Sequence, residues 1–180
     1  MALFTIKEGA HYHALPPFST LPWIGGRKVS RTVSFSPECA YELPAYNSED
    51  VNKLFGLSFG FGGVHHNSAR FGWRWSKADQ CIELLAYVYN EGKRNQDEQL
   101  RFPMVVQVAP GRTLRLRIEY LDDDKDPRYV FTVDNKDGWY IWDEDVPAPK
   151  NLPGYGLTHG LYFGGSLPAP HEMSVTLDRN

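Results

Sequence analysis

Apolar and polar residues alternate over several short stretches of the chain, which is the pattern of β-strands. Val29, Val33 and Phe35 alternate with polar residues, and the same period of two recurs over 82–89, 114–119 and 173–178. That period places one set of side chains in a core and the other toward solvent or a ligand. The period of an amphipathic helix does not occur over any comparable length. The pattern therefore predicts an all-β protein.

Turn-forming residues separate these stretches, as at Gly92, Pro110-Gly111 and Pro153-Gly154. Roughly ten to twelve strands at this spacing favour two stacked antiparallel sheets. The composition agrees, because 10 Phe, 10 Tyr and 5 Trp stand beside 16 Gly and 13 Pro, and these residue types favour strands and turns.

The length of 180 residues indicates one domain over 1–180. The Pro-rich stretch 146–153 is interpreted as a loop over one end of the sandwich, since the chain beyond it is too short to fold alone. A content of 42% hydrophobic and 23% charged residues excludes a disordered chain. Two cysteines, Cys39 and Cys81, could pair but are too few to indicate a redox compartment.

The charge and the hydropathy of the chain argue against two kinds of partner, nucleic acid and the interior of a membrane. The net charge is -3 and the basic residues are scattered, so we expect no nucleic-acid partner. The sequence has no apolar run of about 18 residues, so we expect no membrane span. The N-terminal residues lack the pattern of a signal peptide, which is compatible with a cytoplasmic protein or with a secreted one whose signal has been removed. The oligomeric state stays open.

Three local motifs suggest chemistry that their surroundings do not support. The stretch 56–60 matches G-x-S-x-G, but residues 61–66 are a poor start for the helix that a nucleophile elbow needs. The acidic run 122–126 lacks the Gly and Glu of an EF-hand, since Pro127 and Val133 stand there. His11 and His13 would share one side of an extended segment, but the next four residues, 14–17, include no carboxylate to complete a metal site. We therefore expect no metal and no cofactor.

The stretch 65–75 carries the clearest candidate chemistry. As a strand, it places Phe71 and Trp73 on one face and Arg70 and Arg74 on the other. Tyr87, on the more polar face of a later stretch, could join the arginines. Aromatic rings beside planar donors suit carbohydrate recognition, because rings supply contact area at low entropy cost and donors fix orientation. The structural alternative is a Trp-rich core with a solvated arginine face.

Four segments together resemble a functionally uncharacterised group of bacterial β-sandwich proteins of the concanavalin A-like (lectin/glucanase) jelly-roll type. The segments are FTIKEGAHY (4–12), DVNKLFGLS (50–58), HHNSARFGWRW (65–75) and YFGGSLPAPHEM (162–173). They span nearly the whole chain in order, so the resemblance implies one complete jelly-roll domain. By analogy, this architecture often binds glycans on one sheet or in the loops at its edge.

Two enzyme classes on that fold can be compared with the sequence. Alginate-lyase-like jelly rolls use an arginine-rich strand, a Gln-x-His strand and a tyrosine. Arg70 and Arg74 could stand for the first and Tyr162 for the third, but Ala109 lies two residues after Gln107 where the histidine should be. A general acid or base of that kind contributes about 10²–10⁴-fold. Its loss argues against this activity unless His65, His66 or His171 substitutes for it in space.

Glucanase-type jelly rolls use two carboxylates about 5–5.5 Å apart when they retain configuration. Asp143 and Asp145 would share one face of a strand, after the aromatic stretch 139–142. A solvated strand end explains the same pattern.

The leading interpretation is non-catalytic binding of a polysaccharide or oligosaccharide by an aromatic and arginine-lined sheet face of a two-sheet antiparallel jelly roll. The alternatives are a polysaccharide lyase or glycoside hydrolase on the same fold, and a structural or assembly subunit. The candidate ligand-binding residues are His65, His66, Asn67, Arg70, Arg74, Tyr87, Tyr162 and His171; no catalytic residue is assigned.

Overall fold

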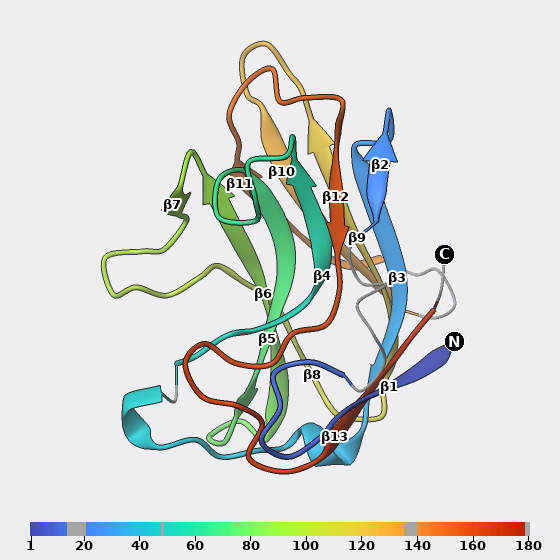
Figure 1. The fold of residues 1–180 in the computed structure, drawn as a ribbon, viewed down its shortest axis with the longest axis vertical. Coiled ribbons are helices and arrows are strands. Elements are labelled where there is room, and N and C mark those ends of the chain that lie inside the picture. The colour runs from blue at the N-terminus through green and yellow to red at the C-terminus, as the bar shows by residue number, and fades with distance from the viewer. Residues whose placement is uncertain (14–20, 48, 136–139, 179–180) are drawn as a thin grey trace.

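The computed structural model describes residues 1–13, 21–47, 49–135 and 140–178. Within them, two antiparallel sheets lie as two layers, with β4, β5 and β6 side by side in one layer and β9, β10 and β11 in the other (Figure 1). The six-stranded sheet has the order β1 (Ala2–Ile6), β13 (Met173–Leu177), β3 (Lys28–Phe35), β9 (Thr113–Leu121), β10 (Arg128–Asn135) and β11 (Tyr140–Pro147).

The seven-stranded sheet is built around β4, β5 and β6, which follow one another along the chain. Its order is β2 (Pro22–Ile24), β12 (Tyr155–His159), β4 (Asn52–Phe59), β5 (Ser68–Ser76), β6 (Cys81–Asn90) and β7 (Lys93–Arg94), and β8 (Met104–Val108) also pairs with β6. Two single-turn 3₁₀ helices, η1 (Pro37–Cys39) and η2 (Ala45–Asn47), lie between β3 and β4.

The expected all-β sandwich of two antiparallel sheets is confirmed. The alternating stretches 29–35, 82–89, 114–119 and 173–178 fall within or overlap β3, β6, β9 and β13. Ser58 lies inside β4 and is fully buried, so the G-x-S-x-G match is part of a strand and not a nucleophile elbow. Cys39 and Cys81 are both free thiols. Among the described residues, no helix has the length or the apolar character needed to cross a bilayer.

The core lies between the sheets and is rich in aromatic rings. Phe71 of β5 contacts Phe131 of β10 edge to face, with ring centroids 5.1 Å apart. Phe35 of β3 and Trp73 of β5 meet at 5.2 Å. All four side chains are at most 2% exposed. Such aromatic pairs contribute beyond the area that they bury, and they fix which face of β5 points into the core.

The two sheets differ on their outer faces. β9 alternates between buried and exposed or half-exposed residues, as expected for a strand with one solvated face. By contrast, most residues of β4, β5 and β6 are buried, and the others are half-buried. On the outer face, Val51, Leu85, Tyr87 and Tyr89 form a second, small apolar cluster that packs against Phe102. The outer face of the seven-stranded sheet is therefore partly covered.

The aromatic core predicts a large difference between two Phe→Ala variants. Phe131 is fully buried and Phe61 is 72% exposed. We expect Phe131→Ala to lower the free energy of unfolding by about 3–5 kcal/mol and Phe61→Ala to change it by about 0.5 kcal/mol or less. Urea denaturation followed by circular dichroism measures both. Equal losses would contradict the position of the core.

Candidate functional site

The register of β4, β5 and β6 arranges the outer face in rows. Gly56 pairs with Arg70, and Arg70 pairs with Tyr87. In the neighbouring row, Ser58 pairs with Ser68, which pairs with Tyr89. Because side chains alternate along a strand, the burial of Phe71 and Trp73 in the core directs Arg70 and Arg74 outward.

Two glycines make room for the long side chains on this face. A Cβ atom added at Gly56 would lie 2.6 Å from Cγ of Arg70, and one at Gly72 would lie 3.4 Å from Cβ of Tyr87 and 2.5 Å from Cγ1 of Val51. Side chains on β4 and β5 would therefore collide with their neighbours at these two points. Gly56 therefore allows Arg70 to pack closely against the sheet, and Gly72 leaves room for Val51.

Arg70 is the most unusual residue of the site. It is only 7% exposed, and its Nε and Nη2 atoms are buried without a hydrogen-bond partner among the described residues. Its guanidinium carbon lies 4.9 Å from the ring centroid of Tyr87, within the range of a cation–π contact. That contact compensates only in part, because each buried donor without a partner costs about 1–3 kcal/mol. The guanidinium is thus held in place with unused donors.

Lys53 brings a second cation to the same ring. Its Nζ atom lies 4.9 Å from the centroid of Tyr87 and 5.5 Å from that of Tyr162, and it donates a hydrogen bond to the Gly164 carbonyl oxygen at 3.1 Å. The backbones of Lys53 and Tyr162 form an isolated antiparallel bridge. Nearby, the buried side chain of Asn52 accepts a hydrogen bond from the Gly164 backbone N–H. This segment therefore forms one wall of the site.

Arg94 and His65 complete the cationic side. Arg94 donates a 2.7 Å hydrogen bond from Nε to the Tyr89 hydroxyl, and its guanidinium carbon lies 5.7 Å from that ring. The His65 ring packs against Tyr89 at a centroid distance of 5.1 Å, and Tyr89 contacts Tyr87 at 5.8 Å. We call Lys53, His65, Arg70, Tyr87, Tyr89 and Arg94 the Arg70 cluster.

The pKa values within the Arg70 cluster show the effect of burial and of like charges. Burial, and then Arg70 and Arg94, lower the pKa of Lys53 to about 8, while Asp50 acts in the opposite direction. The pKa of His65 is lowered by burial and by the same cations together with Lys53. Positive charges dominate the potential here, although the chain as a whole carries a net charge of -3.

A half-buried histidine borders the cluster on β12. His159 pairs with Gly56, and its Nε2 atom lies 2.8 Å from Oγ of Ser58. Burial, and then the charge of Arg70, lower the pKa of His159 to about 4. Its imidazole is therefore neutral at pH 7 and contributes hydrogen bonding without charge.

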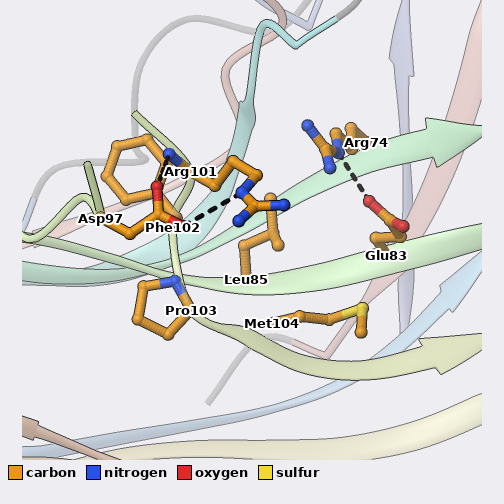
Figure 2. Close-up of a pocket in the computed structure, with 8 residues that line it drawn as sticks. All are labelled: Arg74, Glu83, Leu85, Asp97, Arg101, Phe102, Pro103 and Met104. Atoms are coloured by element: carbon orange, nitrogen blue, oxygen red, sulfur yellow. Dashed lines mark hydrogen bonds and ion pairs between the residues drawn. The ribbon is translucent and has the colours of Figure 1, made fainter. Parts of the chain in front are cut away.

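A cavity of about 430 Å³ lies at the other end of this face (Figure 2). Its charged residues are paired: Arg74 Nε lies 2.6 Å from Glu83, and Arg101 Nε lies 3.0 Å from Asp97. Its lining consists of Arg74, Glu83, Leu85, Asp97, Arg101, Phe102, Pro103 and Met104. Phe102 also stacks on Tyr87 at a centroid distance of 4.3 Å, so the cavity adjoins the Arg70 cluster.

The structure brings four of the predicted site residues close together. Arg70, Tyr87 and His65 belong to the Arg70 cluster. Tyr162 lies at its edge, across Lys53, where its ring also contacts Tyr12 at 5.0 Å.

The other four predicted residues make different contacts. Arg74 lies on the same face but forms ion pairs with Glu83 and Glu49. The remaining three residues form hydrogen bonds with backbone groups of the protein; they are His66, Asn67 and His171. The His66 carbonyl accepts a hydrogen bond from the Gly92 N–H, Asn67 Oδ1 accepts one from the Glu91 N–H, and His171 Nε2 lies 2.7 Å from the Glu38 carbonyl oxygen.

Lys53, Arg94 and His159 belong to the site or border it, although none of them was predicted from the sequence. In the sequence, Lys53 stands out only as part of the segment 50–58 that carries the family resemblance. A lone lysine in a strand usually indicates a position exposed to solvent. The signal available is that this lysine is the one charged residue of the strand 52–59. His159 reaches the site only through the pairing of β12 with β4, which are distant in sequence, and local pattern does not reveal that pairing. Arg94 reaches it through the short hairpin of β6 and β7, where it pairs with Tyr89 just after the turn at Gly92.

The candidate catalytic and metal residues lie elsewhere. Asp143 and Asp145 lie on β11 of the six-stranded sheet, and Asp145 forms an ion pair with Arg128. Trp139, part of the adjoining aromatic stretch, lies outside the described residues. Gln107 contacts Glu83 and Asp79 at the far end from Arg70. Over the described part of the chain, no group of three or more His, Cys, Asp or Glu side chains could hold a metal ion.

The sequence matches no model of a known protein family and no curated protein. The resemblance to the concanavalin A-like group stays a prediction, to which the structure adds the architecture of two antiparallel sheets.

Two outward arginines on β5 differ in their partners and should therefore differ in their effect on stability. Arg70→Met removes a buried guanidinium with unused donors, so we expect the free energy of unfolding to stay unchanged or to rise by about 1 kcal/mol. Arg74→Met leaves Glu83, which is 8% exposed, without its cationic partner, and we expect a loss of about 1–3 kcal/mol. Urea denaturation measures both. If Arg70→Met lowered the free energy of unfolding as much as Arg74→Met does, Arg70 would have a structural role and would not be a residue with unused donors.

Proposed function

We propose that the outer face of the seven-stranded sheet binds a carbohydrate without catalysing a reaction on it. The observation that carries this proposal is the Arg70 guanidinium, which is buried against Tyr87 with two N–H groups that no described residue accepts. A rigid donor without an internal partner suits a ligand that offers several oxygen atoms. Sugars offer such oxygens on a ring whose C–H face packs against aromatic side chains.

Access to the Arg70 cluster is supported on the side of Lys53. Lys53 and Tyr162 are half-buried, and the neighbouring Tyr12 is 61% exposed. The rings of Tyr12 and Tyr162 meet edge to face, and Phe102 stacks on Tyr87. In this proposal a sugar ring packs on the exposed Tyr12, beside Tyr162, whose own ring stacks on His11 at a centroid distance of 5.4 Å. The oxygens of the sugar reach Lys53 and Arg70.

The positions of the candidate catalytic groups bear differently on the two enzyme classes. For the lyase alternative, Gln107 lies near Glu83 and not beside Arg70, whereas His65 of the Arg70 cluster is a histidine that could substitute for the missing one. The hydrolase alternative needs the acidic residues of β11, which belong to the opposite sheet. Both enzyme classes stay alternatives to the binding function.

We also propose that the sandwich is of the concanavalin A-like jelly-roll type. The two-sheet antiparallel architecture supports this proposal, together with the four sequence segments that carry the resemblance.

A structural or assembly subunit remains the third alternative, and one observation bears on it. Ile24 is 88% exposed and pairs across β2 and β12 with Tyr155, which is 44% exposed and contacts the exposed Phe61. Exposed apolar residues that lie together can mark a partner surface. A monodisperse monomer in light scattering would argue against this alternative.

The binding function is tested with a glycan array followed by titration calorimetry on any polysaccharide that the array selects. We expect Arg70→Met to weaken binding by about 10–100-fold, the range for losing hydrogen bonds from a charged donor. The matched control is Arg115→Met, because Arg115 is exposed on the outer face of β9 in the opposite sheet; its affinity should match that of the wild type. Absence of binding to every acidic and neutral glycan tested would refute the proposal.

A further inference from the structure

We propose that the ligand of the Arg70 cluster is an acidic carbohydrate, and that its carboxylate or sulfate group lies between Arg70 and Lys53 beside Tyr87. This inference rests on the proposed carbohydrate binding and narrows it to one chemical class. It depends on the sign of the charge at the site, which the binding proposal by itself does not specify.

The charged groups around the proposed position are mostly cations. Arg70 comes from β5, Lys53 from β4 and Arg94 from β7, and Lys53 and Arg70 both contact the ring of Tyr87. Asp50 is the carboxylate whose charge affects Lys53, and its Oδ2 already accepts a 2.8 Å hydrogen bond from Asn47. An anion that binds here is attracted by Lys53, Arg70 and Arg94. It is repelled by Asp50, whose negative charge is already partly compensated by the hydrogen bond from Asn47.

The depressed pKa of Lys53 supports the same conclusion. Burial lowers it first, and repulsion by Arg70 and Arg94 lowers it further, to about 8. A neutral sugar hydroxyl would supply hydrogen bonds but would leave this repulsion in place. An anion would relieve it, and hydrogen bonds from cations to an anion are roughly twice as strong as neutral ones.

The planar shape of the guanidinium adds specificity for the anion. Nε and Nη2 of Arg70, the two atoms without partners, lie on the same edge of the guanidinium. Two parallel N–H groups on one edge match the two oxygens of a carboxylate, or two of the three of a sulfate ester. Lys53 would then act as a point charge on the side where the site is half-open to solvent.

This arrangement couples ligand binding to protonation of Lys53. The groups that affect its charge are Arg70 of β5, Arg94 of β7 and Asp50, together with His65, whose own pKa is lowered by Lys53; the rings beside it are Tyr87 and Tyr162. An anion beside Nζ favours the protonated amine and raises the pKa of Lys53. Free protein at pH 8 holds about half of its Lys53 protonated, so binding should take up about half a proton.

The affinity should therefore fall as pH rises through the pKa of free Lys53. With that pKa at about 8, the protonated fraction drops about tenfold between pH 7 and pH 9. We expect the association constant for the acidic ligand to drop by the same factor, as long as the pKa in the complex stays above that range.

The chemical class is tested by calorimetry with oligogalacturonate, with its methyl-esterified form, with a sulfated galactan and with a neutral galactan. Preference for the carboxylated or the sulfated ligand over its neutral counterpart by at least about tenfold would support the inference, and the two acidic arms would identify which anion is held. Binding of the neutral or esterified glycans with equal affinity would overturn the inference and leave carbohydrate binding intact. Failure of this panel and of the glycan array together would remove both proposals.

The position of the anion is tested by repeating the titration at pH 8 in two buffers that differ in ionisation enthalpy. Wild-type protein and the Arg115→Met control should both take up about half a proton for each bound anion. Lys53→Met should bind more weakly and show neither the uptake nor the tenfold pH dependence. Absence of proton uptake in the wild type at every pH between 7 and 10, or uptake that is also measured in Lys53→Met, would refute the placement of the anion beside Lys53. Circular dichroism of each variant checks that the fold is retained.

Discussion

The alternation of side chains along β5, fixed by its aromatic contacts with the opposite sheet, determines the rest of the site. Phe71 and Trp73 point into the core, where they contact Phe131 and Phe35. A shift of one residue would move both rings to the outside and both arginines to the inside, so this register is strongly specified. The aromatic core therefore supplies the free energy that holds Arg70 on the outer face in an environment unfavourable to a charge.

Arg70 and Arg74 lie on the same face of β5 but differ in whether a carboxylate pairs with them. Arg74 is matched by Glu83 and Glu49; burial alone would lower its pKa, but the bonds and charges of these two carboxylates outweigh burial and raise it. Arg70 has no such partner among the described residues, and burial lowers its pKa. An arginine whose carboxylate partners belong to the same protein, like Arg74, typically has a structural role. A buried cation that lacks such a partner is a feature that a bound anion would explain, because burial without compensation is unfavourable to folding.

The sequence predicts the strands well where one face of a strand meets the core, since a period of two is then visible, as in 114–119 of β9. It also identifies Arg70 and Tyr87, because both lie on the outward set of a clearly alternating strand. It does not reveal His159, because its proximity to Arg70 depends on the pairing of β12 with β4, which are distant in the chain. Lys53 and Arg94 lie on strands that are neighbours in sequence, but the register that brings them to Arg70 and Tyr89 is not visible in the local pattern. Nor does it reveal that Phe102 covers Tyr87. His171 fails to join the site for the same kind of reason, since it precedes β13, which pairs with β1 and β3 of the other sheet.

The central claim is that the donors of Arg70 are directed at a ligand. Nitrogen-15 NMR of the arginine Nε–H groups tests it most directly, with the Arg70 signal assigned by its loss in Arg70→Met. On addition of an acidic oligosaccharide, the Arg70 signal should shift, while that of Arg74, which is already bonded to Glu83, should stay in place. An Arg70 signal unchanged at saturation, with shifts at other arginines, would contradict the account.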